Sequence, residues 1–204
     1  MIRTLDNKNS STSDLVTNTI LKQNSYFIVD VLCYLFNLSV TSGVFPTGLK
    51  SAEVIPLFKK GDQRLMSNFR PISLLSTIAK LFEKLMKKRI LSFLNKLNFF
   101  SNYQFGFREG RSTEKALLKF CEGIYGSLNE KKCSIGLFVD MTTAFDMVDH
   151  QILLNKLNMI GFRGTIHSWF TSYLMERRQR VKLNGVFSNE LLVVSGVPQG
   201  SAQY

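Results

Sequence analysis

Asp140 stands at a position where an ionised side chain is costly. It directly follows residues 135–139 (IGLFV), an apolar run of strand length that favours a strand buried on both faces of a sheet. Burying an unpaired carboxylate is unfavourable, so Asp140 would need a partner. Two explanations are open: a helix cap or an ion pair with a nearby lysine, or coordination of a hard divalent cation, which prefers carboxylate oxygen.

Two other segments carry polar groups in unusual surroundings. Arg70 directly precedes Pro71 in the segment NFRPIS. Gln199 lies in GVPQGS, directly after a predicted strand, and the glycines on either side permit close backbone approach to a ligand. Asp146 and Asp149 lie where the chain turns into a helix, and Asp149 is predicted to cap it. None of these segments alone specifies a function.

The positive charge is concentrated in the middle third of the chain. The net charge is +11, and residues 51–120 hold fourteen basic and five acidic side chains, a net of +9. Such a block is either a set of solvated helix faces or a surface for a polyanion, where phosphate contacts release counterions. Aromatic residues are interleaved in the same segment, which favours nucleic acid: Phe58, Phe69, Phe82, Phe105 and Phe107.

The composition is that of a globular protein in a reducing compartment. The chain has 204 residues, of which 45% are hydrophobic and 20% charged. Its three cysteines are far apart, which disfavours a disulfide framework and a cysteine zinc site. No signal peptide is apparent, and residues 26–44 are too polar and too short to predict a membrane span. We expect an intracellular protein, nuclear or cytoplasmic, that is not secreted and has no membrane partner.

Periodicity and turn residues predict a mixture of helices and strands. The predicted strands cover residues 52–58, where Pro56 suggests an edge or a bulge, and 135–139, and Asn184-Gly185 predicts a hairpin. A turn is expected at 59–62. Helices are expected at 25–43, in the pattern from Leu74 to Leu97 that follows Pro71, after a cap at Ser112, from Asp149 to Gly161, and at 166–174. This order indicates an α+β fold.

Seven segments, taken in order, resemble one family. They are residues 36–46, 49–62, 68–86, 104–117, 137–157, 161–181 and 196–201. Together they resemble the reverse transcriptase domain of non-LTR retrotransposons, especially the jockey-like group. The resemblance implies the right-hand polymerase fold, with fingers and an incomplete palm and with the thumb absent. The polar residues 1–14 predict a disordered tail, and a helical segment is expected at 15–48. The resemblance implies that this segment leads into a fingers-like region at 49–132, followed by a partial palm at 133–204.

The resemblance also implies a reaction and its partners. In the complete parent protein, a DNA primer would be extended with dNTPs on an RNA template by two-metal nucleotidyl transfer with Mg²⁺. Asp140 matches the first metal-binding and catalytic aspartate, and the backbone carbonyl of Met141 would join it. Phe145 matches the residue under the sugar that excludes a ribose 2′-hydroxyl. The other nucleotide-binding matches are Lys59 and Arg70 at the triphosphate, and Gln199 and Gly200 beside the incoming nucleotide.

One departure from the family pattern limits the expected activity. The family carries an adjacent pair of aspartates after GVPQGS, and no such pair occurs in these 204 residues. We therefore expect residues 1–204 to be inactive by themselves and to self-associate through an exposed palm edge. Two alternatives stay open: a non-catalytic RNA- or DNA-binding protein that reuses the fingers region, and a decayed remnant of an element.

Overall fold

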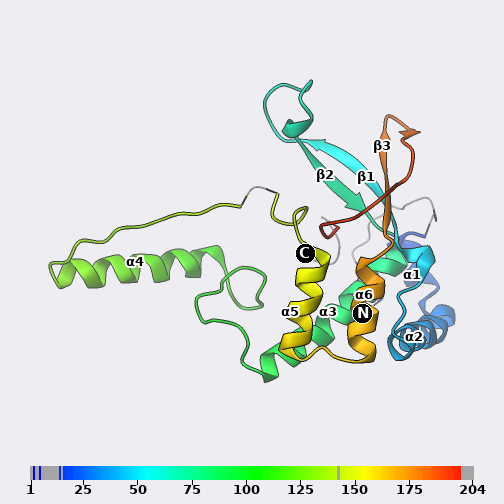
Figure 1. Cartoon of the computed structure of the whole chain (residues 1–204), viewed down its shortest axis with the longest axis horizontal. Coiled ribbons are helices and arrows are strands. Elements are labelled where there is room, and N and C mark those ends of the chain that lie inside the picture. The colour runs from blue at the N-terminus through cyan, green and yellow to red at the C-terminus, as the bar shows by residue number, and fades with distance from the viewer. Residues whose placement is uncertain (1, 3–4, 6–13, 15, 142, 199–204) are drawn as a thin grey trace. The chain divides into compact units, whose positions relative to one another are not determined.

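The computed structural model describes the whole chain except residues 1, 3–4, 6–13, 15, 142 and 199–204 (Figure 1). Helices and strands are mixed, which agrees with the predicted α+β class. The described residues form two compact units: unit 1 lies within 1–86 and 143–202, and unit 2 lies within 87–142.

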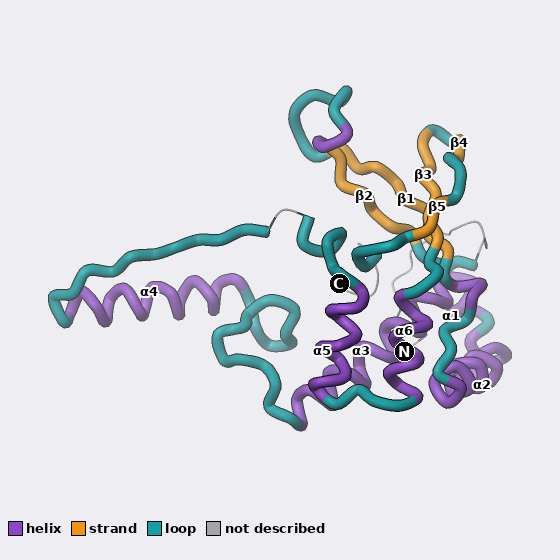
Figure 2. Tube along the Cα trace, viewed as in Figure 1, coloured by secondary structure: helices purple, strands orange, loops and turns teal. Residues whose placement is uncertain are grey.

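Unit 1 contains a small mixed sheet, drawn in orange in Figure 2. The strand order is β2-β1-β3-β4, and β5 also pairs with β3. The β1–β3 pair is parallel, and the other pairs are antiparallel. The strands are β1 (Ser51–Phe58), β2 (Phe69–Leu74), β3 (Arg178–Leu183), β4 (Val186–Phe187) and β5 (Leu191–Leu192).

Pro56 lies where β1 has a neighbour on one side only. β1 is a central strand, but its pairing with β3 covers only the four residues from Ser51 to Val54. Pro56 lies beyond that stretch, opposite Pro71 of β2. Proline has no N–H to donate to a ladder, so it fits a position that behaves locally as an edge. The predicted edge character is confirmed for this part of the strand.

The hairpin predicted at Asn184-Gly185 joins β3 to β4. Leu183 and Val186 are directly paired, and Asn184 and Gly185 both have positive φ, 50° and 82°. Two successive residues of positive φ are what a tight two-residue hairpin requires.

The helices of unit 1 begin and end largely where the caps predict. The Asp149 carboxylate accepts the N–H of Ile152 at 2.8 Å at the start of α5, and Gly161 (φ 116°) ends that helix. Ser25 was predicted to cap α2, but it is the first helical residue and Asn24 occupies the cap position. The helices are α1 (Asn18–Gln23), α2 (Ser25–Ser42), α5 (His150–Ile160), α6 (Thr165–Leu174) and the first ten residues of α3 (Thr77–Lys96).

Aromatic side chains hold these helices together. Trp169 of α6 is 1% exposed, and its indole N–H donates to the Ser39 hydroxyl of α2 at 2.9 Å. Its ring stacks on that of Tyr173, with centroids 5.5 Å apart. The Tyr173 hydroxyl donates to the Glu83 carboxylate of α3 at 2.7 Å. Burial, together with the charge of Glu83, raises the pKa of Tyr173 far above its ordinary value.

The segment after Pro71 differs from its prediction. The apolar periodicity predicted a helix from Leu74 onward, whereas residues up to Leu74 form strand β2 and α3 begins at Thr77. Leu74 fits both patterns, because its spacing to Ile78 is helical while its backbone pairs with Glu53 of β1. Pairing with a distant strand therefore overrides the local pattern.

α2 is the one helix in the described part of the chain that is long and apolar enough to cross a membrane, with a mean hydropathy of 1.3. Buried core helices and signal sequences meet the same criteria. α2 also contains Asp30 and packs against the rest of unit 1 through Phe36 and Ser39. Its length and composition therefore assign no membrane span.

Unit 2 consists of the end of α3, a loop, α4 (Thr113–Asn129) and an extended segment. Ser112 caps α4 as predicted, accepting the N–H of Lys115 at 3.3 Å. The predicted strand at 135–139 is wrong: these residues pair with no strand in the described part of the chain, and Ile135 and Leu137 are 96% and 88% exposed. The segment runs back beside α4 (Figure 1), and the Phe138 ring contacts that of Phe120 at 5.6 Å. A strand forms only when another backbone completes its ladder, and none does so within the described residues.

Most of the predicted tail, residues 1–14, lies outside the described residues. Of those that are described, Ile2 is buried against Leu21 of α1 and Leu81 of α3, with Leu5 packed beside them. The predicted ranges for tail, helical segment, fingers and palm stay predictions.

Candidate functional site

Two loops of unit 1 that are distant in sequence are joined through their backbones. The Gly196 N–H donates to the Val148 carbonyl at 2.8 Å, and the Val197 N–H donates to the Phe145 carbonyl at 2.9 Å. The loop that leads into Gln199 is thereby attached to the loop that carries Phe145. Both loops were singled out from sequence, and the structure brings them together.

Gly196 is required by this attachment. Its φ is +83°, and a Cβ at this position would lie 2.8 Å from the carbonyl oxygen of Asp146 and 2.9 Å from its Cα. Real Cβ atoms do not approach backbone so closely, so only glycine fits without displacing one of the loops. The glycines of this loop were expected to permit close approach by a ligand. For Gly196, the close neighbour is the backbone of Asp146.

His150 joins the same two loops from the start of α5. Its side chain is buried, and Nε2 lies 2.7 Å from the carbonyl oxygen of Gly196. A carbonyl oxygen only accepts, so the imidazole donates. Sequence reasoning missed this residue, because its only local signal was its position beside the cap Asp149.

A cleft of about 430 Å³ lies between the sheet and these loops, entirely within unit 1. Its walls include Ala52 and Val54 of β1, Ser73 of β2, and the chain from Leu192 to Pro198. Arg177 also lines it; this side chain is 2% exposed, and its Nη2 has no hydrogen-bond partner in the described part of the chain. A buried guanidinium with a spare donor favours a polar or anionic neighbour.

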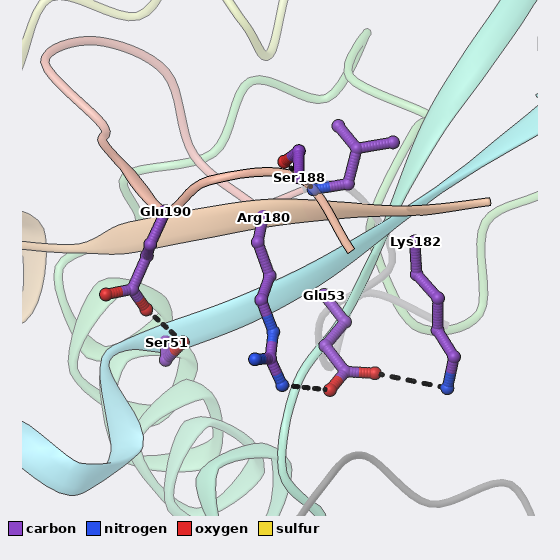
Figure 3. Close-up of polar contacts among 7 residues, drawn as sticks. Ser51, Glu53, Arg180, Lys182, Ser188 and Glu190 are labelled. Atoms are coloured by element: carbon purple, nitrogen blue, oxygen red, sulfur yellow. Dashed lines mark hydrogen bonds and ion pairs between the residues drawn. The ribbon is translucent and has the colours of Figure 1, made fainter. Parts of the chain in front are cut away.

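Ion pairs on the opposite face of the sheet fix the β1–β3 register under this cleft (Figure 3). Successive side chains of a strand point to opposite faces of the sheet. Because Ala52 and Val54 line the cleft, Glu53 between them points away from it. Its carboxylate accepts from Arg180 at 2.9 Å and lies 3.7 Å from the Lys182 ammonium. Glu53 and Arg180 are also directly paired in the ladder. Because Glu53 is only 3% exposed, removing both cations would take two favourable charge interactions away from a buried carboxylate.

Lys59 and Arg70 lie at the far end of the β1–β2 hairpin. Arg70 is paired with Leu57, and the Lys59 N–H continues the ladder by donating to the Asn68 carbonyl at 2.8 Å. The alternation of strand side chains puts Lys59 and Arg70 on one face, as diagonal neighbours with Cα atoms roughly 7–8 Å apart. Both are exposed. Two cations at this spacing can contact one polyphosphate, although their predicted role stays a prediction.

Asp140 and Met141 belong to the extended segment of unit 2, and both are exposed. The predicted burial of Asp140, and the need for a partner that follows from it, are therefore absent. Within the described residues, no group of three or more Asp, Glu, His and Cys side chains could hold a metal ion. The metal role of Asp140 and of the Met141 carbonyl rests on the resemblance alone. Gln199 and Gly200 lie outside the described residues.

Comparison with known proteins settles the family. A family model described as "Reverse transcriptase (RNA-dependent DNA polymerase)" matches residues 58–203, which include both joined loops. The chain belongs to the reverse transcriptase family. Within this family it is a jockey-like non-LTR retrotransposon sequence, because proteins of such elements match nearly all of it.

Two relatives from Drosophila melanogaster illustrate the similarity. One, "Probable RNA-directed DNA polymerase from transposon BS", is 31% identical over 201 residues, covering 98% of this chain and 22% of that protein. The other, "RNA-directed DNA polymerase from mobile element jockey", is 30% identical over 202 residues with the same two coverages. This reverse transcriptase chain therefore spans about a fifth of the length of these relatives.

Proposed function

We propose that this chain is part of an RNA-directed DNA polymerase that, as a complete protein, copies an RNA template into DNA from dNTPs. The family match over residues 58–203 carries this proposal. The finer architecture is proposed with it: a right-hand fold whose fingers lie within 49–132 and whose partial palm lies within 133–204. The RNA template and a DNA primer are the proposed partners, and a nuclear or cytoplasmic location is proposed for the protein.

The residues of unit 1 have separate proposed tasks in binding the nucleotide. Lys59 and Arg70, on one face of the hairpin, neutralise the triphosphate. The Phe145 ring lies under the sugar and excludes a 2′-hydroxyl. Gln199 and Gly200 contact the base pair being formed. The backbone hydrogen bond from Val197 to Phe145 supports this assignment of roles. It joins the loop that carries Phe145, proposed to select the sugar, to the segment that precedes Gln199.

Magnesium is the proposed metal, but the Asp140 carboxylate and the Met141 carbonyl are too few oxygen donors to hold two ions. Asp140 offers one exposed carboxylate, with the Met141 carbonyl beside it, whereas Mg²⁺ requires near-octahedral oxygen ligands. The ions would stabilise the attacking and leaving oxygens when bound. The described residues contribute binding and orientation of the nucleotide.

Primer extension by the full-length protein that contains this chain tests the proposal. We expect DNA synthesis on a primed RNA template with Mg²⁺ and dNTPs, and its loss in Asp140→Asn, which keeps the size of the side chain but removes its charge. Synthesis that survives Asp140→Asn would contradict the role of Asp140. Tight RNA binding without any synthesis would instead support a non-catalytic binding protein, which the polymerase names of the relatives do not favour.

A further inference from the structure

We propose that His150 is a positioning residue for the nucleotide site, an inference that rests on the function proposed above. His150 lies within the resembling segment 137–157, but the resemblance assigns no role to it. Its imidazole donates to the Gly196 carbonyl at 2.7 Å from a position that is 5% exposed. It therefore acts on the nucleotide only through the loop that it holds.

Three hydrogen bonds meet at this point, and each fixes a different backbone group. The Gly196 N–H is held by Val148, the Gly196 carbonyl by His150, and the Val197 N–H by Phe145. Both polar groups of Gly196 are thus bound, so the peptide planes on its two sides cannot rotate independently. The three bonds therefore hold the start of the segment 196–198 against the loop that carries Phe145.

The helix that begins at His150 has hydrogen-bonded caps at both ends, which makes it a suitable anchor. His150 is the first residue of α5, and the Asp149 carboxylate caps that helix. The opposite end of α5 is closed by Gly161. A histidine at the capped end of a helix holds its imidazole in place at little further entropic cost, because the backbone is already ordered. The same contact made from a loop would also require the loop to be ordered.

Loss of this contact has a specific kinetic consequence. Within the described residues, His150 is the donor found for the buried Gly196 carbonyl, so its loss favours movement of this loop toward water. Because Val197 of the same loop is hydrogen-bonded to the Phe145 carbonyl, the backbone that carries Phe145 loosens together with residues 196–198. We expect the KM for dNTPs to rise about tenfold and discrimination against ribonucleotides to fall, with a smaller change in kcat.

His150→Leu and His150→Gln separate hydrogen bonding from packing. Leu fills much of the space but donates nothing, whereas the Gln amide nitrogen can reach the position of Nε2. The matched control is His167→Leu. His167 of α6 lies with Nε2 3.2 Å from the Leu154 carbonyl of α5, so its replacement also breaks a histidine–carbonyl contact, but one outside the two loops.

Two measurements on the full-length protein are needed. The first is steady-state primer extension with varied dNTP and rNTP. The second is amide hydrogen exchange of the peptide containing Gly196 and Val197, which requires no activity. We expect His150→Leu to raise the KM for dNTPs and to speed this exchange about tenfold, His150→Gln to restore both, and His167→Leu to change neither.

The two readouts distinguish failure of this inference from failure of the proposed function. Unchanged exchange in His150→Leu would overturn the inference whatever the activity. Faster exchange with an unchanged KM would also overturn it, because the loop would then be held without serving the nucleotide. A wild-type protein that synthesises no DNA would refute the polymerase proposal, and with it the positioning role, while the exchange data would still establish the contact.

Discussion

Replacing Gly196 by alanine tests the junction of the two loops most directly. Two separate effects act at this position. The backbone has a φ of +83°, which costs any L-residue free energy, and the new Cβ would lie 2.8 Å from the Asp146 carbonyl oxygen. Because the obstacle is backbone, no side chain can rotate away to make room, and one loop must move.

The size of the effect follows from what is lost when the loop moves. The positive φ costs about 1 kcal/mol. Displacement also breaks the hydrogen bonds from Gly196 to Val148 and from Val197 to Phe145, at about 1 kcal/mol each. Gly196→Ala should therefore lower the free energy of unfolding by about 3 kcal/mol.

Gly185→Ala is the matched control for the backbone effect. Gly185 has nearly the same φ, +82°, but a Cβ there would have nothing within 4 Å. Gly185→Ala should lower the free energy of unfolding by about 1 kcal/mol. The two variants should therefore differ by about 2 kcal/mol, or roughly thirtyfold in the unfolding equilibrium constant. Urea unfolding of residues 1–204 can be followed through Trp169, which is the only tryptophan in the sequence and is 1% exposed in unit 1. Equal losses in the two variants would refute the close contact with Asp146.

Four further outcomes are expected. RNA affinity of residues 1–204 should fall steeply with salt, because +9 of the net charge lies in 51–120; a flat salt response would contradict phosphate binding. In the full-length protein, Phe145→Ala should relax discrimination against ribonucleotides in primer extension; unchanged selectivity would leave Phe145 a packing residue. The pKa of the Tyr173 hydroxyl is raised in the folded protein, so the unfolded chain loses the hydroxyl proton at a lower pH. The free energy of unfolding, measured with urea, should therefore fall above about pH 10 in the wild type and fall less in Tyr173→Phe. Leu137→Lys should reduce self-association of residues 1–204 in light scattering, because Leu137 is 88% exposed within an apolar run; equal scattering would place the contact elsewhere.

Features that depend on a few neighbouring residues could be predicted from the sequence. The Asp149 cap, the Gly161 end of α5 and the hairpin at Asn184-Gly185 are confirmed, because each is decided within three or four residues. Strand β2 could not be predicted in the same way. Its state is decided by pairing with β1, and Leu74 satisfies the helical spacing equally well.

The site shows the same division between local and distant causes. The resemblance singled out Phe145 and the GVPQGS loop, and both are part of the junction found in unit 1. It did not predict how they are joined. His150 and Gly196 are 46 residues apart, and neither the imidazole nor the glycine carries a local signal for the other. Contacts of this kind follow from the fold and are found only when it is known.

The segment 135–139 shows what an apolar pattern does and does not establish. Five apolar or small residues in a row predict that the segment is stable only when both of its faces are covered and its backbone is paired. Within the described residues neither condition is met, and the segment lies extended with Leu137 and Phe138 exposed. The apolar pattern therefore states correctly what a strand at 135–139 would require, but the prediction that a strand forms is wrong.

The exposure of Asp140 likewise removes an argument made from burial. A carboxylate in solvent needs no counter-charge, so its burial no longer argues for a metal, and family membership is the remaining support for that role.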